Sequence, residues 1–277
     1  MTDKYAVLGN PIAHSKSPQI HALFAQQTGQ DISYEAIFVP AGYDNFAVEV
    51  MRLRKAGYKG CNITVPFKQT AYQLGFVGIT LSHSEDVRYA MAANTLKFLD
   101  GAIQLENTDG IGLVRDLTQN LFAKLRGKKL LLIGAGGAAR GVISPLHHAG
   151  ANITITNRTA EKAYILAEGF EFNISICGYD ELADNKFDFI INATSAGLKD
   201  EMPDIPKTIF EPGALAYDMM YGRETPFMKF ARDHGAEIVI DGLGMLVEQA
   251  AESFRIWRGH DLKLNTASVI QALRDQK

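Results

Sequence analysis

A glycine-rich loop constrains the fold of this chain more than any other segment. Residues 134–139 read GAGGAA and follow a short apolar run, Lys129–Ile133, which is typical of a central parallel strand. A helix is expected after the loop and a second strand over Ala151–Thr156. Glycines there allow a tight turn and a close approach of the backbone to a pyrophosphate at the helix N-terminus. The order strand, loop, helix, strand therefore predicts a dinucleotide-binding unit, and a glycine turn without a ligand is the alternative.

The residues after the second strand indicate which dinucleotide binds. NAD sites commonly place an Asp or Glu about 20 residues beyond the glycines, where it binds the ribose 2′-hydroxyl. Here that place holds Asn157, Arg158 and Thr159, and the first acidic residue is Glu161. The planar guanidinium of Arg158 suits a 2′-phosphate. We therefore predict NADP rather than NAD; the alternative is that Arg158 is only a solvated loop residue.

Length and charge exclude several classes of protein. At 277 residues the chain can form one large or two medium domains. The formal net charge of −3 gives no electrostatic reason to expect a nucleic acid or an anionic membrane as partner. The sequence contains no uncharged apolar run long enough to span a membrane. A small-molecule ligand is the remaining expectation.

Cysteine and histidine usage point to a reducing compartment and to no metal. The two cysteines, Cys61 and Cys177, are far apart and lack metal-ligand spacing. The first residues do not resemble a secretory signal, so we expect a cytoplasmic protein. The histidines are scattered, and the adjacent pair His147-His148 is too close to face one metal from a helix.

The remaining pattern predicts two α/β domains, one of them discontinuous. Strands are expected at Lys129–Ile133, Ala151–Thr156, Asn173–Ile176, Phe187–Asn192, Ala214–Asp218 and Glu237–Ile240. Their alternation with helices predicts a doubly wound parallel sheet. The first 105 residues suggest strands at Tyr5–Leu8, Ser33–Val39 and Gly60–Thr64, helices near Ser17–Thr28 and Tyr43–Ala56, and a hairpin of Thr95–Leu99 with Ile103–Leu105 that finishes the sheet.

The helices expected at the end of the chain, Met245–Trp257 and Thr266–Arg274, should return to the first domain. We therefore predict a substrate-binding domain of residues 1–108 and 243–277 and a cofactor domain of residues 109–242. A cleft is expected between the two, with a closing motion that excludes water.

Four polar clusters lie outside the glycine-rich loop. They are Ser15–Pro18 (SKSP), Asn62–Lys68 (NITVPFK), Ala93–Thr95 (ANT) and Glu106–Gly110 (ENTDG). Each has a simpler structural explanation, because Ser17 and Asp109 suit helix N-caps and an isolated Lys68 suits the solvated surface. The clusters indicate a site only if the fold brings them together. Ligands of open α/β sheets bind beyond the strand C-termini, which is where Asn62–Lys68 is expected.

Taken together, these motifs resemble the shikimate dehydrogenase family. The matching blocks are Ser15–Pro18, Asn62–Lys68, Ala93–Thr95, Asn107–Gly110, Gly134–Arg140, Asn157–Thr159, Asn192–Gly197 and Asp241–Ala250. They follow the family's order from near the N-terminus to Ala250. Eight blocks in register are highly specific, whereas any one alone would not be. The resemblance implies an α/β fold of two domains, a substrate-binding domain and a Rossmann-type domain for NADP.

The resemblance also implies roles for individual residues. The catalytic pair would be Lys68 and Asp109. Substrate contacts would come from Ser15 and Ser17 on the carboxylate, and from Asn62, Thr64, Asn94, Asp109, Gln249 and Tyr221 near the ring hydroxyls. Cofactor contacts would come from Gly134, Gly136, Gly137, Ala138, Asn157, Arg158 and Thr159, with Thr194, Ser195, Met219 and Gly242 flanking the ribose and nicotinamide.

The implied reaction is the reversible NADPH-dependent reduction of 3-dehydroshikimate to shikimate, a step in aromatic amino-acid biosynthesis. The cofactor would carry hydride to the C3 carbonyl, and the protein would supply orientation and the proton. Lys68 would then act as a proton relay beside Asp109 rather than as a strong base. Two alternatives stay open, an NAD-linked quinate/shikimate dehydrogenase and a non-catalytic NADP-binding regulator. The assembly expected is a monomer or a homodimer.

Some positions depart from the family's usual pattern. Residues 91–93 read MAA where Gly-Ala-Val is common, and the stretch from Gly75 to Tyr89 is unusual. Ala22 follows His21 where Asn is frequent, and Arg223 stands where many members have Pro. These differences concern the shape of the substrate-side loop rather than the predicted chemistry.

Overall fold

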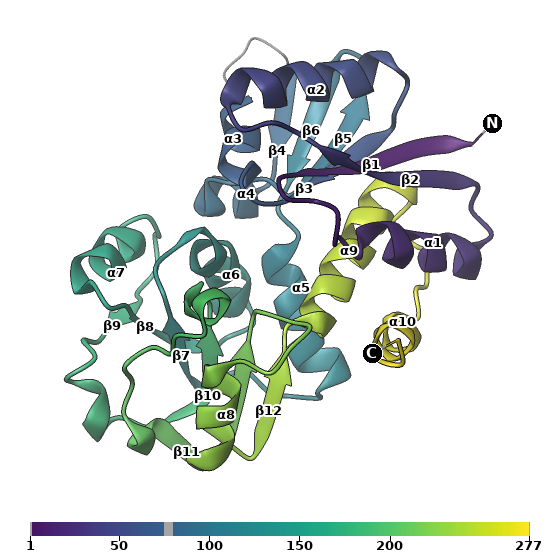
Figure 1. Ribbon diagram of the computed structural model, residues 1–277. Helices are drawn as coiled ribbons and strands as arrows, with labels where there is room; N and C mark the ends of the chain where they lie inside the picture. The colour runs from purple at the N-terminus through teal and green to yellow at the C-terminus, as the bar shows by residue number, and fades with distance from the viewer. Residues whose placement is uncertain (1, 75–79, 277) are drawn as a thin grey trace. The chain divides into compact units, whose positions relative to one another are not determined.

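The computed structural model describes residues 2–74 and 80–276 and divides the chain into two compact units (Figure 1). The first unit combines Met1–Gly112 with Val247–Lys277, and the second is Leu113–Leu246. Part of the unusual stretch noted in the sequence, residues 75–79, lies outside the described residues. Which unit binds the substrate and which the cofactor is still a prediction at this point.

The first unit is built on a mixed sheet of six strands. In chain order these are β1 (Asp3–Gly9), β2 (Ile32–Phe38), β3 (Gly60–Ile63), β4 (Thr80–His83), β5 (Thr95–Leu99) and β6 (Ala102–Glu106). They lie in the order β2-β1-β3-β5-β6-β4. The predicted hairpin is confirmed, because β5 and β6 pair antiparallel around Asp100-Gly101, with Gly101 at φ 71°.

The expectation that this hairpin finishes the sheet was wrong. The outer edge of β6 pairs in parallel with β4, a strand that the sequence did not reveal. β4 has only four residues, so it offers too few positions for an alternating pattern to stand out. The helices before and after this strand, α3 (Lys68–Gln73) and α4 (Glu85–Ala90), have six residues each and were not predicted.

Helices cover both faces of this first sheet (Figure 1). On one face α2 (Tyr43–Lys55), α3 and α4 bury an apolar core that includes Phe46, Val50 and Phe67. The other face carries α1 (Ser17–Thr28) and the part of α9 (Leu243–Arg258) that belongs to this unit. There Trp257 stacks on Tyr5, with ring centroids 4.6 Å apart.

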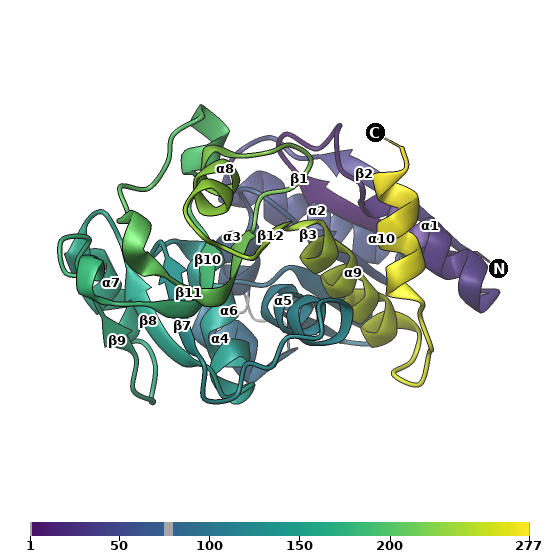
Figure 2. The ribbon, with the colours of Figure 1, turned by 90° about the horizontal axis from the view of Figure 1, so that it is seen from below.

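The C-terminal helices return to the first unit, as the sequence predicted. The indole Nε1 of Trp257 donates to the carbonyl of Leu96 at 2.9 Å, which joins α9 to β5. A side chain at Gly60 would overlap both groups, so only glycine leaves room for this contact. α10 (Thr266–Arg274) lies beside α1 in Figures 1 and 2, and Gln27 of α1 bonds to Asn265 at the start of α10.

The second unit is a doubly wound parallel sheet, as predicted. Its strands are β7 (Lys129–Ile133), β8 (Asn152–Thr156), β9 (Ser175–Ile176), β10 (Phe187–Asn192), β11 (Phe210–Asp218) and β12 (Ile238–Asp241). They lie in the order β12-β11-β10-β7-β8-β9, and all of the pairings are parallel. The direction of winding reverses between β7 and β10, which is where ligands bind in sheets of this kind.

Helices α6 (Gly137–His148), α7 (Ala160–Ala167) and α8 (Pro226–Asp233) connect these strands. All six predicted strands are present, with differences at their ends. The edge strand β9 has two residues where Asn173–Ile176 was expected. β11 begins earlier than predicted, at Phe210, because its first residue already pairs with Phe187 before the register shifts. Pro212 and Gly213 within it conceal a strand from pattern analysis.

Candidate active site

The glycine-rich loop connects β7 to α6 at the reversal point of the second sheet. Gly134 has φ 113°, a conformation that side-chain-bearing residues rarely adopt, and its N–H donates to Thr156 O at 2.8 Å. Gly136 is the N-cap residue of α6, and open space lies where side chains at Gly136 and Gly137 would project. The first turn of α6 therefore offers unobstructed backbone N–H groups, which suits a phosphate.

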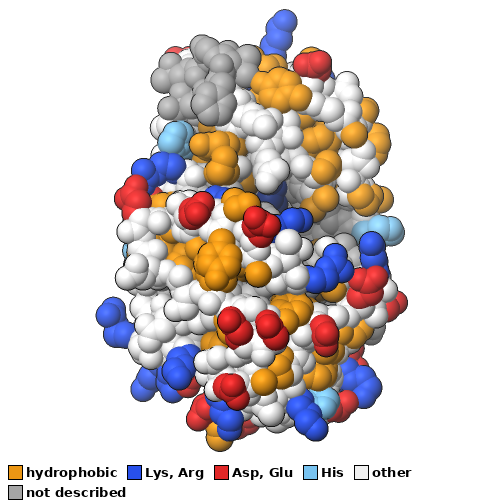
Figure 3. Space-filling model, turned by 90° about the vertical axis from the view of Figure 1, so that its left-hand side faces the viewer, with side chains coloured by type: hydrophobic (Ala, Val, Ile, Leu, Met, Phe, Trp, Pro, Cys, Tyr) orange, Lys and Arg blue, Asp and Glu red, His pale blue; other side chains and the backbone are white. Residues whose placement is uncertain are grey.

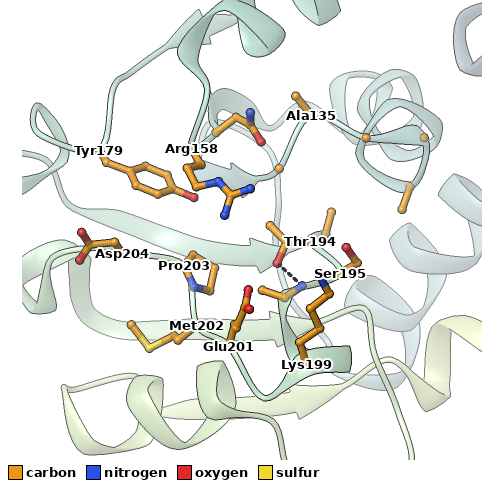
Figure 4. A pocket seen from close by; sticks show the side chains of 17 residues that line it. Ala135, Arg158, Tyr179, Thr194, Ser195, Lys199, Glu201, Met202, Pro203 and Asp204 are labelled. Carbon is orange, nitrogen blue, oxygen red and sulfur yellow. Dashed lines mark hydrogen bonds between the residues drawn. The ribbon is translucent and has the colours of Figure 1, made fainter.

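A pocket of about 750 Å³ opens beside this loop (Figure 4). Residues 134–138 form one part of its lining, and Asn157, Arg158 and Tyr179 form another. The Arg158 side chain points into the pocket, and the hydroxyl end of Tyr179 points toward it (Figure 4). Thr159, the third residue of the predicted 2′-phosphate cluster, instead occupies the N-cap position of α7, and its carbonyl accepts from Asn157 Nδ2 at 2.8 Å.

The opposite side of the pocket comes from the segment after β10. Thr194 and Ser195, both predicted to contact the cofactor, line it together with residues 199 and 201–204. The hydroxyl of Thr194 donates to Asn192 Oδ1 at 2.8 Å and accepts from the N–H of Ala196 at 3.4 Å, so this turn is held by its own side chains (Figure 4).

Sequence reasoning missed several residues of this pocket, namely Tyr179, Lys199, Glu201, Met202, Pro203 and Asp204. They lie on irregular segments that follow β9 and β10, where no periodicity marks them. The general rule that loops at the carboxyl ends of parallel strands form the site was the available signal.

Met219 and Gly242 lie at the ends of β11 and β12. A side chain at Gly242 would overlap the backbone of Met219, so glycine is required for these two loops to pack together.

The neighbouring residue Asp218 is fully buried and accepts hydrogen bonds from Asn192 Nδ2 at 3.1 Å and Thr225 Oγ1 at 2.6 Å. Burial raises the pKa of Asp218, and these hydrogen bonds act in the opposite direction. Tyr221, a predicted substrate contact, is exposed and belongs to this second unit.

The predicted catalytic pair lies in the first unit, where two helix starts meet. Lys68 begins α3 and Asp109 begins α5 (Asp109–Arg115), and Lys68 Nζ lies 2.6 Å from Asp109 Oδ2. The side chains are 32% and 15% exposed, so the pair is accessible to a ligand but partly shielded. The alternative that Lys68 is an isolated surface charge is wrong, because its ammonium is held by a carboxylate.

Asn94 holds the other oxygen of the same carboxylate. Its Nδ2 donates to Asp109 Oδ1 at 3.0 Å, and the same nitrogen lies 2.9 Å from Thr108 Oγ1 and 3.1 Å from Gln249 Oε1. Asn94 is 2% exposed and its Oδ1 accepts from the Thr108 N–H at 2.9 Å. Three predicted substrate contacts, Asn94, Asp109 and Gln249, are thus brought together around Lys68.

The serines of the first polar cluster lie at the start of α1. Ser17 is the first residue of the helix and Lys16 is its N-cap residue, so the N-cap explanation of Ser17 was wrong. The Ser15 hydroxyl instead accepts from the Ser17 N–H at 3.3 Å. Thr64 follows directly after β3, and its N–H donates to Leu8 O at 2.9 Å.

Asn62 differs from the other predicted substrate contacts, because its amide is engaged inside the unit. It is 6% exposed. Its Oδ1 accepts from the Tyr34 hydroxyl at 2.7 Å, and its Nδ2 lies 2.9 Å from Ser253 Oγ and 3.2 Å from Asn94 O. These contacts use the hydrogen-bonding capacity of the amide, so it has little left for a substrate.

His21 packs against this amide in the interior of the first unit. It is fully buried, stacks on Tyr34 with ring centroids 4.3 Å apart, and its Nε2 lies 3.1 Å from Asn62 Oδ1. Its Nδ1 is buried without a hydrogen-bond partner. Burial lowers the pKa of His21 to about 3, with the hydrogen bond to Asn62 opposing the shift.

The lowered pKa of His21 makes stability depend on pH. The unfolded chain binds a proton on this ring below about pH 6.5, whereas the folded chain does not until about pH 3, so stability is lost as the pH falls. In urea unfolding, we expect the wild type to lose about 2 kcal/mol more than His21→Phe between pH 7 and pH 5. The other histidines are common to both proteins, so the difference between the two losses isolates His21. Equal losses would contradict the assignment.

Other classes of site find no support in the described part of the chain. Within residues 2–74 and 80–276 there is no group of three His, Cys, Asp or Glu side chains that could hold a metal ion. None of the described helices has the length and apolarity needed to cross a membrane. On the face shown in Figure 3, basic and acidic side chains are interspersed rather than gathered by sign.

Comparison with known proteins gives the family. Three family models match: the shikimate dehydrogenase substrate binding domain over residues 7–96, shikimate / quinate 5-dehydrogenase over residues 116–199, and the shikimate 5'-dehydrogenase C-terminal domain over residues 242–274. A shikimate dehydrogenase (NADP(+)) of Methylobacillus flagellatus is 52% identical over 98% of this chain and 99% of its own. One of Aromatoleum aromaticum is 49% identical over 99% and 98%.

Solved structures agree with these relatives. An Ael1 enzyme from Pseudomonas putida is 45% identical, covers 98% of both chains and has a TM-score of 0.91. A shikimate 5-dehydrogenase of Thermus thermophilus, in complex with NADP(H) and shikimate, is 31% identical, covers 99% of both chains and has a TM-score of 0.84. With family models across both units and relatives of about half identity over nearly its whole length, the chain belongs to the shikimate dehydrogenase family.

Proposed function

We propose that this protein catalyses the reversible, NADP-dependent interconversion of shikimate and 3-dehydroshikimate. The observation that carries the proposal is the Lys68–Asp109 pair, 2.6 Å apart and flanked by Asn94 and Gln249 in the first unit. The family membership and the names of the relatives that match over the whole chain support the same reaction.

The second unit fits a dinucleotide with a 2′-phosphate. Open space at Gly136 and Gly137 lets the pyrophosphate reach the first turn of α6, and Arg158 points into the adjoining pocket. Thr194, Ser195, Met219 and Gly242 would lie along the nicotinamide half. Bound NADPH supplies the hydride that reduces the C3 carbonyl of the substrate.

The residues of the first unit would bind the substrate and move the proton. Lys68 donates a proton from Nζ to the carbonyl oxygen as negative charge develops there, and takes it back in the reverse direction. Asp109 holds the ammonium in place through Oδ2, and Asn94 fixes Oδ1 of the same carboxylate. The hydroxyls of Ser15 and Ser17 would receive the substrate carboxylate at the start of α1, with Thr64, Asn94 and Gln249 on the ring hydroxyls. Contacts of Asn62 and Tyr221 with the substrate remain predictions.

A spectrophotometric assay of the purified protein tests the proposal. NADP⁺ or NAD⁺ is mixed with shikimate or quinate, and reduction of the cofactor is followed at the NADPH absorbance band. We expect the largest kcat/KM for shikimate with NADP⁺. A preference for quinate with NAD⁺ would instead support the alternative dehydrogenase. Binding of NADP⁺ in calorimetry without turnover of either substrate would indicate a non-catalytic regulator.

We also propose that the enzyme works in the cytoplasm, as a monomer or a homodimer and without nucleic acid. Both cysteines are free, Cys61 buried and Cys177 half-buried, as expected in a reducing compartment. Light scattering after size-exclusion chromatography would measure the assembly.

A further inference from the structure

A continuous chain of hydrogen bonds runs through the interior of the first unit and ends at the Lys68–Asp109 pair. From Asp109 it passes to the amide of Asn94, whose Oδ1 accepts from Thr95 Oγ1 at 3.0 Å. Thr95 Oγ1 lies 2.7 Å from Ser253 Oγ, and Asn62 Nδ2 lies 2.9 Å from the same Ser253 oxygen. Asn94, Thr95, Ser253 and Asn62 are all buried.

The other end of this chain reaches the start of α1. Asn62 Oδ1 accepts from the Tyr34 hydroxyl at 2.7 Å. Burial raises the pKa of Tyr34 and the side chain of Ser17 acts in the opposite direction, which places Ser17 beside Tyr34. The hydrogen-bond chain therefore runs from Asp109, proposed to act at one side of the substrate, to Tyr34, which adjoins Ser17, proposed to bind the substrate carboxylate. Four of its members come from four separate elements: Tyr34 from β2, Asn62 from β3, Thr95 from β5 and Ser253 from α9.

The amide of Asn62 is the junction of this chain. It receives Tyr34 and His21 on Oδ1, and its Nδ2 faces Ser253, Thr95 and the carbonyl of Asn94. The side chains of the hydrogen-bond chain from Tyr34 to Asp109 all have partners, whereas Nδ1 of the neighbouring His21 has none. A chain of paired buried groups is rigid, because alternative arrangements leave further donors or acceptors unpaired. Loss of one member frees its neighbours to rotate, and small displacements of catalytic groups lower rates strongly.

We propose that Tyr34 and Ser253 are positioning residues, which act through Asn62 to fix Ser17 at one end of the substrate and Asn94 with Asp109 at the other. The inference rests on the proposed function, since it assigns these two residues to the same reaction. Neither residue carries an expected contact with substrate or cofactor. Their contribution is to hold the two ends of the site at a fixed spacing.

A double-mutant cycle with Tyr34→Phe and Ser253→Ala tests this coupling. The wild type is first assayed with shikimate and NADP⁺; absence of turnover there would overturn the proposed function rather than the coupling. We expect each single variant to lower kcat/KM by about tenfold. The double variant should lose about the same factor, because the first substitution already interrupts the hydrogen-bond chain and the second adds little. Independent structural effects would instead multiply to about a hundredfold.

Tyr5→Phe is the matched control. Tyr5 is another tyrosine of this unit next to Trp257: it is buried and stacks on that ring, whereas Tyr34 is half-buried and tilted against it. The Tyr5 hydroxyl faces Arg258 and takes no part in the hydrogen-bond chain. We expect its kcat/KM to stay within about twofold of the wild type. Multiplicative losses in the cycle, unchanged single variants, or an equal loss in Tyr5→Phe would each overturn the inference. If Ser253→Ala does not fold, as judged by thermal unfolding, Ser253→Cys takes its place in the cycle.

Discussion

The Lys68→Ala variant is expected to turn over shikimate at least about 10²-fold more slowly than the wild type, with little change in KM for shikimate. Lys68 Nζ is 2.6 Å from Asp109 Oδ2, so the variant loses the proposed proton donor and leaves the carboxylate without its counter-charge. The residues proposed to bind the substrate are mainly other groups, so we expect binding to be less affected than turnover. Steady-state kinetics with NADP⁺ at saturation measure both constants.

Two further variants separate proton transfer from simple loss of charge or packing. Lys68→Met keeps most of the side-chain volume without the ammonium, and it should be as slow as Lys68→Ala. Lys55→Ala removes an exposed lysine from α2 of the same unit and should leave kcat unchanged. A wild-type kcat in Lys68→Ala would show that Lys68 takes no part in the chemical step.

The fold was predictable where the physical signal is strong. The apolar strands β7 and β10 are almost entirely buried in the second sheet, and such strands stand out in the sequence as near-continuous apolar runs. The Asp100-Gly101 turn marked the β5–β6 hairpin because glycine supplies the positive φ that this turn needs. β4 was not found, because its place at the sheet edge depends on pairing with β6 rather than on its own four residues.

The candidate site was predictable as a set of residues but not as a network. The sequence placed Lys68 and Asp109 in separate motifs, and their resemblance to one family implied the pair that the fold brings to 2.6 Å. Tyr34 and Ser253 carry no motif, since a buried hydroxyl is recognised only by its partners in space. Asn62 was predicted on the substrate, whereas the structure engages its amide within the unit. Such contacts join segments far apart in the chain, so spacing could not reveal them.

The Arg158→Gln variant is expected to change cofactor preference rather than turnover. Hydrogen bonds to charged groups contribute about 1.5–3 kcal/mol, which corresponds to a loss of about 10- to 100-fold in kcat/KM for NADP⁺. The lower part of that range is favoured, because Arg158 is exposed and solvent screens its charge. NAD⁺ lacks the 2′-phosphate, so its kcat/KM should change little, and the ratio of the two constants is the measurement.

Two further variants test how the 2′-phosphate is recognised. They distinguish the planar guanidinium of Arg158 from a positive charge alone. Arg158→Lys keeps the charge but cannot bind two phosphate oxygens in one plane, so its NADP⁺ preference should fall between those of the wild type and Arg158→Gln. Lys199 lines the same pocket, and Lys199→Ala should lower kcat/KM for NADP⁺ by less than about fivefold, as for an exposed charge. A larger loss in Lys199→Ala than in Arg158→Gln would indicate that the 2′-phosphate binds on the side of the pocket that Lys199 lines. Equal losses with NADP⁺ and NAD⁺ in Arg158→Gln would instead place the guanidinium on the adenosine that the two cofactors share.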